Sequence, residues 1–190
     1  MDWNHPPLVP GDLFDDTFDV EPDYTEPFDA VILPLRDQVV YPRMVTPLYI
    51  GRADSLEALS HIADHHWPVV VVTQQQTELD AYPVGSDLFA IGTEIIILRS
   101  INLPDGTVSV IAQAVGRVRI HHYLQESPFL LANVEGLPEN FEDTALNQAL
   151  ARSVLAMFEK VVDLNQAIPE ESYVYAMNVE SPGELCDIVA

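Results

Sequence analysis

The chain has little positive charge, almost no cysteine and no long apolar run. Its 8 Lys and Arg residues face 30 Asp and Glu residues, a net charge of -22, so its average surface repels phosphate groups and anionic lipids. We therefore expect neither nucleic acid nor membrane partners. No apolar run approaches the ~18 residues of a membrane-spanning helix, and the acidic N-terminus is unlike a basic signal or transit peptide. The single cysteine, Cys186, fits a reducing compartment, and we expect a cytoplasmic protein.

Motifs for catalysis and for metal binding are also missing. The only lysine, Lys160, is not part of a G-x-x-x-x-G-K-[ST] sequence, which excludes a phosphate-binding loop of that type. Lys160 follows Glu159 in a helical pattern, so we interpret it as a solvated helix residue and not as a member of a Ser-Lys dyad. His61 and His65 have metal-ligand spacing, but the Glu of H-E-x-x-H and a third ligand are absent. We predict no metal, no cofactor and no catalytic residue; a hydrolase using paired carboxylates is the catalytic alternative.

Residues 1–29 form a compositionally distinct acidic segment. It contains nine acidic residues, several prolines and no Lys or Arg, with aromatic residues spaced among them. Like charges without periodicity cannot offset chain entropy, so we expect an extension that is disordered in isolation. The alternative interpretation is an acidic and aromatic recognition tail.

Residues 30–138 are rich in short apolar runs that predict strands. The run VVVVT at 69–73 is typical of a buried strand, and FLLANVEGL at 129–137 predicts another. Two β-branched runs meet at LPDG, residues 103–106, whose Pro, Asp and Gly favour a tight turn, so they predict a hairpin. Apolar residues at helical spacing predict one helix after Gly51, which Asp54 or Ser55 could cap.

Residues 141–190 show helical periodicity and predict a helical subdomain. One long helix is followed by a shorter one at 170–177, and Ser181 with Glu184 has the form of a capping box for a third. The third helix has barely two turns when the sequence ends, and no stop signal follows. We therefore expect a chain cut from a longer protein.

The stretch VILPLRDQVVYPRMVTPLYIGR at 31–52 combines strand-like apolar residues with three prolines. Each of Pro34, Pro42 and Pro47 lacks a backbone donor, and proline is tolerated in sheets only at edges, strand starts or bulges. We predict that these prolines leave a barrel incomplete, with an open strand edge.

The ordered set of motifs resembles the N-terminal domain of Lon, the ATP-dependent bacterial and mitochondrial protease. The resemblance rests on LPLRDQVVYPRMVTPLYIGR at 33–52, DLFAIGTEIIILR at 87–99, LPDGTVSVIAQAVGRVRI at 103–120 and NVESPGELCDIVA at 178–190. It implies an α+β fold in which a PUA-like β pseudo-barrel is followed by an α-helical C-terminal part. The acidic extension has no counterpart in the family's pattern, and the chain ends before the ATPase and Ser-Lys protease modules would begin.

The resemblance also implies a function. A domain of this kind would be non-catalytic, would recognise and recruit unfolded or damaged proteins, and would support hexamer assembly with the rest of the Lon protease chain. The alternative is a free-standing Lon-domain adaptor or ligand-binding protein. PUA-like folds include RNA binders, but the basic stripes and interleaved aromatic residues of an RNA-binding surface are lacking here.

Recognition of unfolded chains requires an exposed apolar patch or an open strand edge. Our candidate substrate-binding residues are Leu35, Tyr41, Pro47 and Ile111. The first three flank the proline-containing edges, and Ile111 is an apolar residue on an otherwise polar strand face. The alternative is that Leu35 and Tyr41 are core residues.

Overall fold

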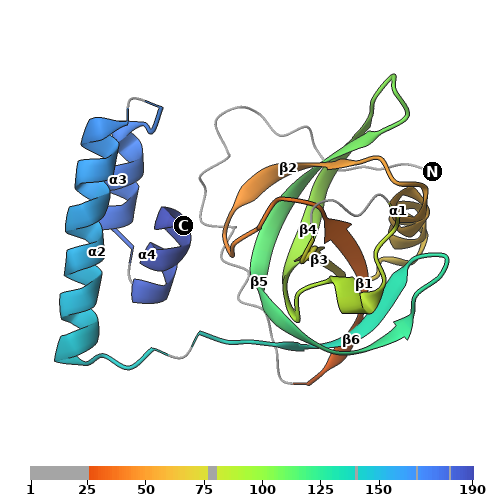
Figure 1. Ribbon diagram of the computed structural model, residues 1–190, viewed down its shortest axis with the longest axis horizontal. Helices are drawn as coiled ribbons and strands as arrows, with labels where there is room; N and C mark the ends of the chain where they lie inside the picture. The colour runs from red at the N-terminus through yellow and green to blue at the C-terminus, as the bar shows by residue number, and fades with distance from the viewer. Residues whose placement is uncertain (1–25, 77–80, 140, 166, 180) are drawn as a thin grey trace.

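The computed structural model describes residues 26–76, 81–139, 141–165, 167–179 and 181–190 (Figure 1). Most of the acidic extension predicted at 1–29 thus lies outside the described residues. The described elements are, in chain order, β1 (Phe28–Leu35), β2 (Val45–Ile50), α1 (Ala53–His65), β3 (Val69–Thr73), a 3-10 turn (Gly85–Asp87), β4 (Ile91–Asn102), β5 (Val108–Gln125), β6 (Leu130–Gly136), α2 (Ala145–Leu164), α3 (Glu170–Met177) and α4 (Pro182–Val189).

Strand β5 closes the sheet into a barrel. Its first half pairs with β2, its second half pairs with β6, and β4 runs along its other side. The pairings lead from β5 through β4, β3, β1 and β6 back to β5, so these five strands form a ring, and β2 is attached to that ring only through β5. Among the strand pairs of the described residues, β1–β3 alone is parallel. The fold is of the α+β class, with a β pseudo-barrel followed by helices, as predicted.

Pro34 belongs to β1, which is one strand of the closed ring. The prediction that this proline leaves the barrel incomplete is therefore wrong. Val31 and Leu35 direct backbone hydrogen-bonding groups toward β3, so the alternate residue Pro34 directs its nitrogen toward β6. The last pair between β1 and β6 is Ile32–Leu130. The missing donor therefore falls just beyond the end of that ladder, where no partner would have bound it.

The barrel interior is filled by β-branched and leucine side chains, and α1 packs against one end of it. Ala58 and Ile62 of α1 are buried in one of the two core clusters, together with inward-facing residues of β1, β2, β3 and β5. Arg52 occupies the N-cap position of α1 and makes no side-chain cap, while Ser55 is buried. The prediction that Asp54 or Ser55 caps this helix is therefore wrong, because the helix begins before both residues.

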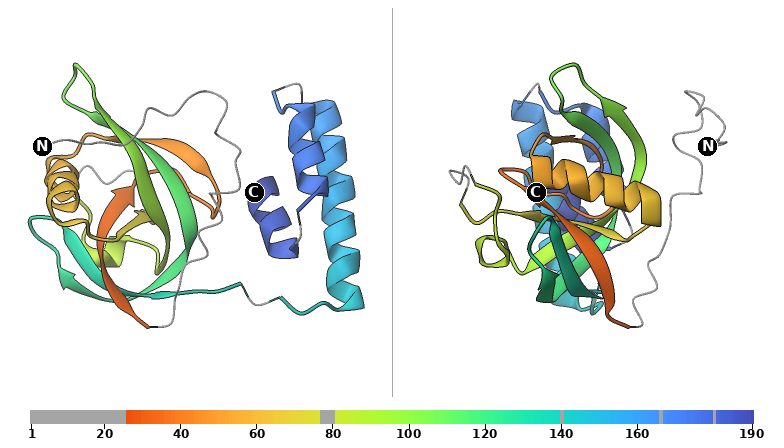
Figure 2. Two further views of the ribbon diagram at one scale, coloured as in Figure 1. Left: turned by 180° about the vertical axis from the view of Figure 1, so that it is seen from behind. Right: turned by 90° about the vertical axis from the view of Figure 1, so that its right-hand side faces the viewer.

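The helices after residue 144 form a separate layer beside the barrel. Helix α4 lies between the barrel and the α2–α3 pair, which is clear in the two opposed views (Figures 1 and 2). The predicted cap of α4 is confirmed, since the Ser181 hydroxyl accepts a hydrogen bond from the backbone N–H of Glu184 at 3.0 Å. Helix α3 has the predicted bounds. Within the described ranges, no helix combines the length and the apolar character needed to cross a membrane.

Two arginines of the barrel side are ion-paired with α4 and the segment before α2. Arg117 on β5 forms a two-pronged ion pair with Asp187 of α4. Arg43, just before β2, has guanidinium contacts of 3.5 Å to Glu184 and 3.9 Å to Glu139. Its φ of 66° is in the left-handed region that residues other than glycine rarely adopt. These charged contacts connect the helical layer to the barrel.

Candidate functional site

One side of the β2–β5–β4 part of the sheet exposes apolar side chains. The strand β2 alternates, with Thr46, Leu48 and Ile50 buried and the residues between them exposed. The sheet register aligns the exposed residues in rows across three strands: Val45–Gln113–Ile96, Pro47–Ile111–Arg99 and Tyr49–Ser109–Ile101. We call the six apolar members of these rows the outer apolar face: Val45, Pro47, Tyr49, Ile96, Ile101 and Ile111.

The outer apolar face is well exposed even though the helical layer lies next to the barrel. The exposed fractions are 55% for Val45, 71% for Tyr49, 40% for Ile96 and 41% for Ile101, while Ile111 is half-buried. Exposed apolar side chains gathered on one face of a sheet mark sites of interaction with other chains. These side chains stand on paired strands, and such a surface suits an extended partner better than a small molecule.

Two of the predicted site residues, Pro47 and Ile111, meet at the centre of this face. They are directly opposite each other in the antiparallel β2–β5 ladder. Ala114 donates to the carbonyl of Met44, which makes the even-numbered residues of β2 the hydrogen-bonded ones and leaves Pro47–Ile111 a non-hydrogen-bonded pair. In such pairs the side chains lie closest together. The proline therefore interrupts no bond to β5.

The other two predicted residues do not belong to the face. Leu35 is 7% exposed and lies in the barrel core, so it has no surface to offer a partner. Tyr41 is half-buried in the loop before β2, and its backbone N–H lies 3.3 Å from the sulfur of Met44. Both residues were predicted only because they lie next to prolines. A neighbouring proline carries no information about which side of a strand faces outward.

Four members of the face are not among the residues predicted from the sequence. Val45 and Tyr49 could have been found from the alternation in VTPLYI, because they share a strand face with Pro47. Ile96 and Ile101 could not, since a register irregularity between Ile97 and Arg99 shifts the β4 alternation by one residue.

The polar residues of the three rows have different environments. Ser109 and Gln113 are both 9% exposed. The strand face around Ile111 is therefore less open to solvent than expected for a face with these polar residues. The guanidinium of Arg99 forms no ion pair with any carboxylate in the described ranges. Arg99 is thus the one charged residue of the three rows, and it stands at the end of the central row.

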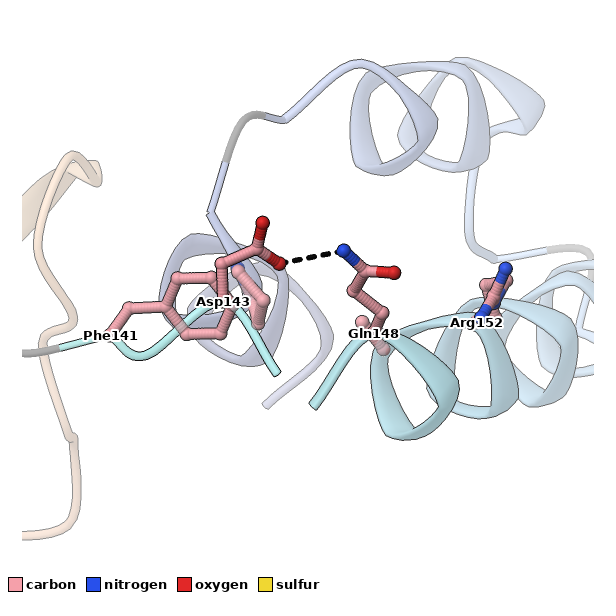
Figure 3. A pocket seen from close by; sticks show the side chains of 6 residues that line it. Phe141, Asp143, Gln148 and Arg152 are labelled. Atoms are coloured by element: carbon pink, nitrogen blue, oxygen red, sulfur yellow. Dashed lines mark hydrogen bonds between the residues drawn. The ribbon is translucent and has the colours of Figure 1, made fainter. Parts of the chain in front are cut away.

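A pocket of about 530 Å³ lies elsewhere, between the β6–α2 connection and α4 (Figure 3). It is lined by Phe141, Asp143, Gln148, Ala151, Arg152 and Pro182, and Gln148 donates a hydrogen bond of 2.7 Å to Asp143. The described residues of its lining include no serine, cysteine or histidine. Among the described residues no three His, Cys, Asp or Glu side chains are grouped to hold a metal ion.

Residues 29–190 match the sequence model of the ATP-dependent protease La (LON) substrate-binding domain. The chain belongs to this family. Its relatives include the Lon protease of Koribacter versatilis, 36% identical over 160 residues that cover 84% of this chain and 19% of that protein. The Lon protease of Escherichia coli K12 is 34% identical over 171 residues, which cover 90% of this chain and 22% of that protein. The chain thus spans about a fifth of the length of these Lon proteases, and the matching part is the non-catalytic substrate-binding domain.

Solved structures of Lon N-terminal domains share the fold. The N-terminal domain of the Mycobacterium avium complex Lon protease superposes with a TM-score of 0.67 at 20% identity, covering 84% of this chain and 80% of that one. A Lon N-terminal domain protein from Xanthomonas campestris gives a TM-score of 0.51 at 16% identity, covering 84% and 95%. The pseudo-barrel with its helical layer is therefore the fold of this Lon domain family.

Proposed function

We propose that this Lon-family domain recruits unfolded or damaged proteins to an ATP-dependent protease in the cytoplasm, and that the outer apolar face is where they bind. The observation that carries the proposal is the Pro47–Ile111 pair, held on rigid strands at the centre of six apolar side chains. Unfolded proteins expose apolar segments that folded proteins bury, so a flat apolar face distinguishes the two without reading one sequence. In this proposal residues 30–138 form the binding unit and residues 141–190 a helical unit.

The expected affinity of one face is weak. A contact of ~300 Å² of apolar surface at ~25 cal/mol/Å² provides several kcal/mol before the entropy of association is subtracted. Weak single sites release their substrates readily, which suits delivery to a protease. Several copies in one assembly raise the effective concentration and make capture efficient.

Assembly is the second part of the proposal, and it rests on α2. The side of α2 turned away from α3 and α4 carries an exposed apolar stripe, which we call the α2 stripe: Leu146, Leu150, Met157, Val161 and Leu164. Three of its residues are seven apart, which is the repeat by which helices pack against one another. Helix α2 also holds two basic and two acidic residues, so it is neutral within a chain of net charge -22. We propose that a second copy of this chain packs on the α2 stripe and that this contact supports the hexamer.

The binding part of the proposal is tested with two isoleucines of β4. Ile101 belongs to the outer apolar face and is 41% exposed, whereas Ile91 lies outside it and is 48% exposed. We expect Ile101→Thr to weaken binding of reduced and amidomethylated α-lactalbumin about fivefold to tenfold, because about 1 kcal/mol of apolar contact is lost. Ile91→Thr should leave binding unchanged. Fluorescence anisotropy of the labelled unfolded protein measures both.

Ile111→Thr extends this test to the centre of the face. It should weaken binding at least as much as Ile101→Thr, because Ile111 lies in the central row of the face, directly opposite Pro47. Thermal unfolding of each variant separates a loss of contact from a loss of folding. Equal weakening by Ile91→Thr, or no weakening by the two face variants, would contradict the proposed site.

A further inference from the structure

We propose that the polypeptide segments captured by this domain bind as an added strand on the free edge of β2, beside the outer apolar face. This inference rests on the proposed function and specifies how the substrate is held. It assigns the backbone of β2, and not only its side chains, to the binding site.

The hydrogen-bond register shows which backbone groups of β2 are available. The carbonyl of Met44 and the N–H and C=O groups of the even-numbered residues of β2 point to β5, whereas the N–H of Met44 donates to the carbonyl of Tyr41. The odd-numbered residues Val45, Pro47 and Tyr49 therefore direct theirs to the opposite edge. Within the described part of the chain, no strand pairs with that edge. It offers N–H donors at Val45 and Tyr49 and carbonyl acceptors at all three residues.

The edge of β2 has little protection against strand addition. Proteins commonly protect edge strands with charged side chains, prolines, bulges or a covering helix. The sequence of β2, VTPLYI, contains no charged residue, and its one protective residue is Pro47. That proline removes a donor at the middle of the edge and leaves both flanking donors in place. An exposed, uncharged and apolar edge is the template that extended chains use in strand addition.

The same three residues determine which segments fit. In an antiparallel addition, the residues placed opposite Val45, Pro47 and Tyr49 direct their side chains to the outer apolar face. Apolar residues at alternate positions would extend that face by one strand and bury part of Tyr49, which is 71% exposed. The net charge of -22 disfavours acidic segments. The partner is thus an extended, neutral or basic segment with apolar residues at every second position.

A capped seven-residue peptide, Thr-Phe-Thr-Val-Thr-Phe-Thr, is the probe for this geometry. Its two phenylalanines would pair with Val45 and Tyr49, and its valine with Pro47. N-methylation of both phenylalanine nitrogens removes the hydrogen bonds that the peptide donates to the carbonyls of Val45 and Tyr49 and places methyl groups against the edge, so it should weaken binding at least tenfold. N-methylation of the two inner threonine nitrogens, which point away from β2, should change affinity by about twofold or less. In hydrogen exchange, the peptide should slow the amides of Val45 and Tyr49.

Pro47 provides a test with the opposite sign. Pro47→Val supplies the missing N–H at the middle of the edge, so strand addition predicts binding of the same peptide about threefold to tenfold tighter, as expected for one further hydrogen bond. Tyr49→Pro removes a donor and should weaken it, with circular dichroism confirming that the variant is folded. Binding through side chains alone predicts no gain from Pro47→Val.

The outcomes separate this inference from the proposed function. Equal effects of the two N-methylation patterns, together with unchanged affinity in Pro47→Val, would overturn strand addition. If Ile111→Thr still weakened binding of the unfolded protein in that case, the outer apolar face would remain the site. If neither set of variants changed binding, both proposals would fail.

Discussion

The hydroxyl of Tyr123, in the second half of β5, is buried without a hydrogen-bond partner among the described residues. Burial, with a smaller contribution from the carboxylate of Glu126, raises the pKa of Tyr123 to about 12. The ionised phenol is disfavoured because it would leave water for the apolar surroundings of β5 and β6. At the residue scale, Tyr123 thus makes stability depend on pH in the alkaline range.

The sign of this dependence follows from the two pKa values of Tyr123. In the unfolded chain the phenol ionises near its ordinary pKa of ~10, so between ~10 and about 12 the folded state holds the proton more strongly. The contribution of Tyr123 to the free energy of unfolding is complete below pH ~10 and is lost as the pH rises through about 12. We therefore predict that Tyr123→Phe makes the fall in the free energy of unfolding above pH ~10 less steep, as measured by urea titration.

At about pH 7 the same substitution removes a buried hydroxyl that has no partner, so stability should stay level or rise by up to ~1 kcal/mol. Tyr49→Phe is the matched control, because it removes the same hydroxyl from a side chain that is 71% exposed. An equally steep alkaline decline in Tyr123→Phe and in the unmodified chain would contradict this account.

Single residues also show what sequence reasoning could and could not find. Pro47 and Ile111 both belong to the outer apolar face, and both were chosen from local signals, an edge proline and an apolar residue among polar ones; their role in binding stays a prediction. That they form one cross-strand pair depends on register, which no local pattern contains. Leu35 packs in the core, which is the alternative that the sequence left open for this residue.

At the scale of elements, α4 is attached to the barrel by the ion pair between Arg117 and Asp187. The side chain of Asp187 is 7% exposed and that of Arg117 is 33% exposed, so the pair is partly shielded from water and its two hydrogen bonds are charge-assisted. We predict that Asp187→Asn lowers the free energy of unfolding by about 1–2 kcal/mol and increases hydrogen exchange in α4. Urea titration and exchange mass spectrometry measure the two effects.

Arg119 provides the control for this junction. It lies two residues along β5 from Arg117, is exposed, and has no carboxylate partner in the described ranges. Arg119→Gln should leave both stability and α4 exchange unchanged. A double variant, Arg117→Gln with Asp187→Asn, should cost less than the sum of the two single variants, because the charges act as a pair. Additive losses would show that the pair contributes nothing to docking.

The sequence predicted the elements that depend on one local pattern. It did not predict the pairing of a strand that has two partners. The 103–106 hairpin, β3, α3 and the α4 cap follow from local turn chemistry and periodicity. The closed ring does not follow from local patterns, because it depends on β5 pairing with β2 over one half and with β6 over the other. A continuous run of 18 strand residues gives no sign of where one partner ends.

At the scale of the whole molecule, net charge and the α2 stripe have opposing effects on self-association. A charge of -22 makes any two copies repel each other, while the neutral α2 provides apolar surface for contact. Raising the salt concentration from ~0.01 M to ~0.3 M shortens the Debye length from about 30 Å to less than 10 Å and screens the repulsion. Salt leaves apolar contact largely intact over this range. Self-association through α2 should therefore strengthen with salt, by an estimated several-fold in the association constant.

Sedimentation equilibrium at the two salt concentrations measures this change, and two residues of similar exposure locate the contact. Met157 in the α2 stripe is 59% exposed, and Val174 on α3 is 54% exposed. Met157→Gln should abolish self-association, because it places an amide in the middle of the contact, and Val174→Gln should not. Association that weakened with salt would instead require complementary charges across the interface. That outcome would contradict a contact held mainly by the apolar side chains of the α2 stripe.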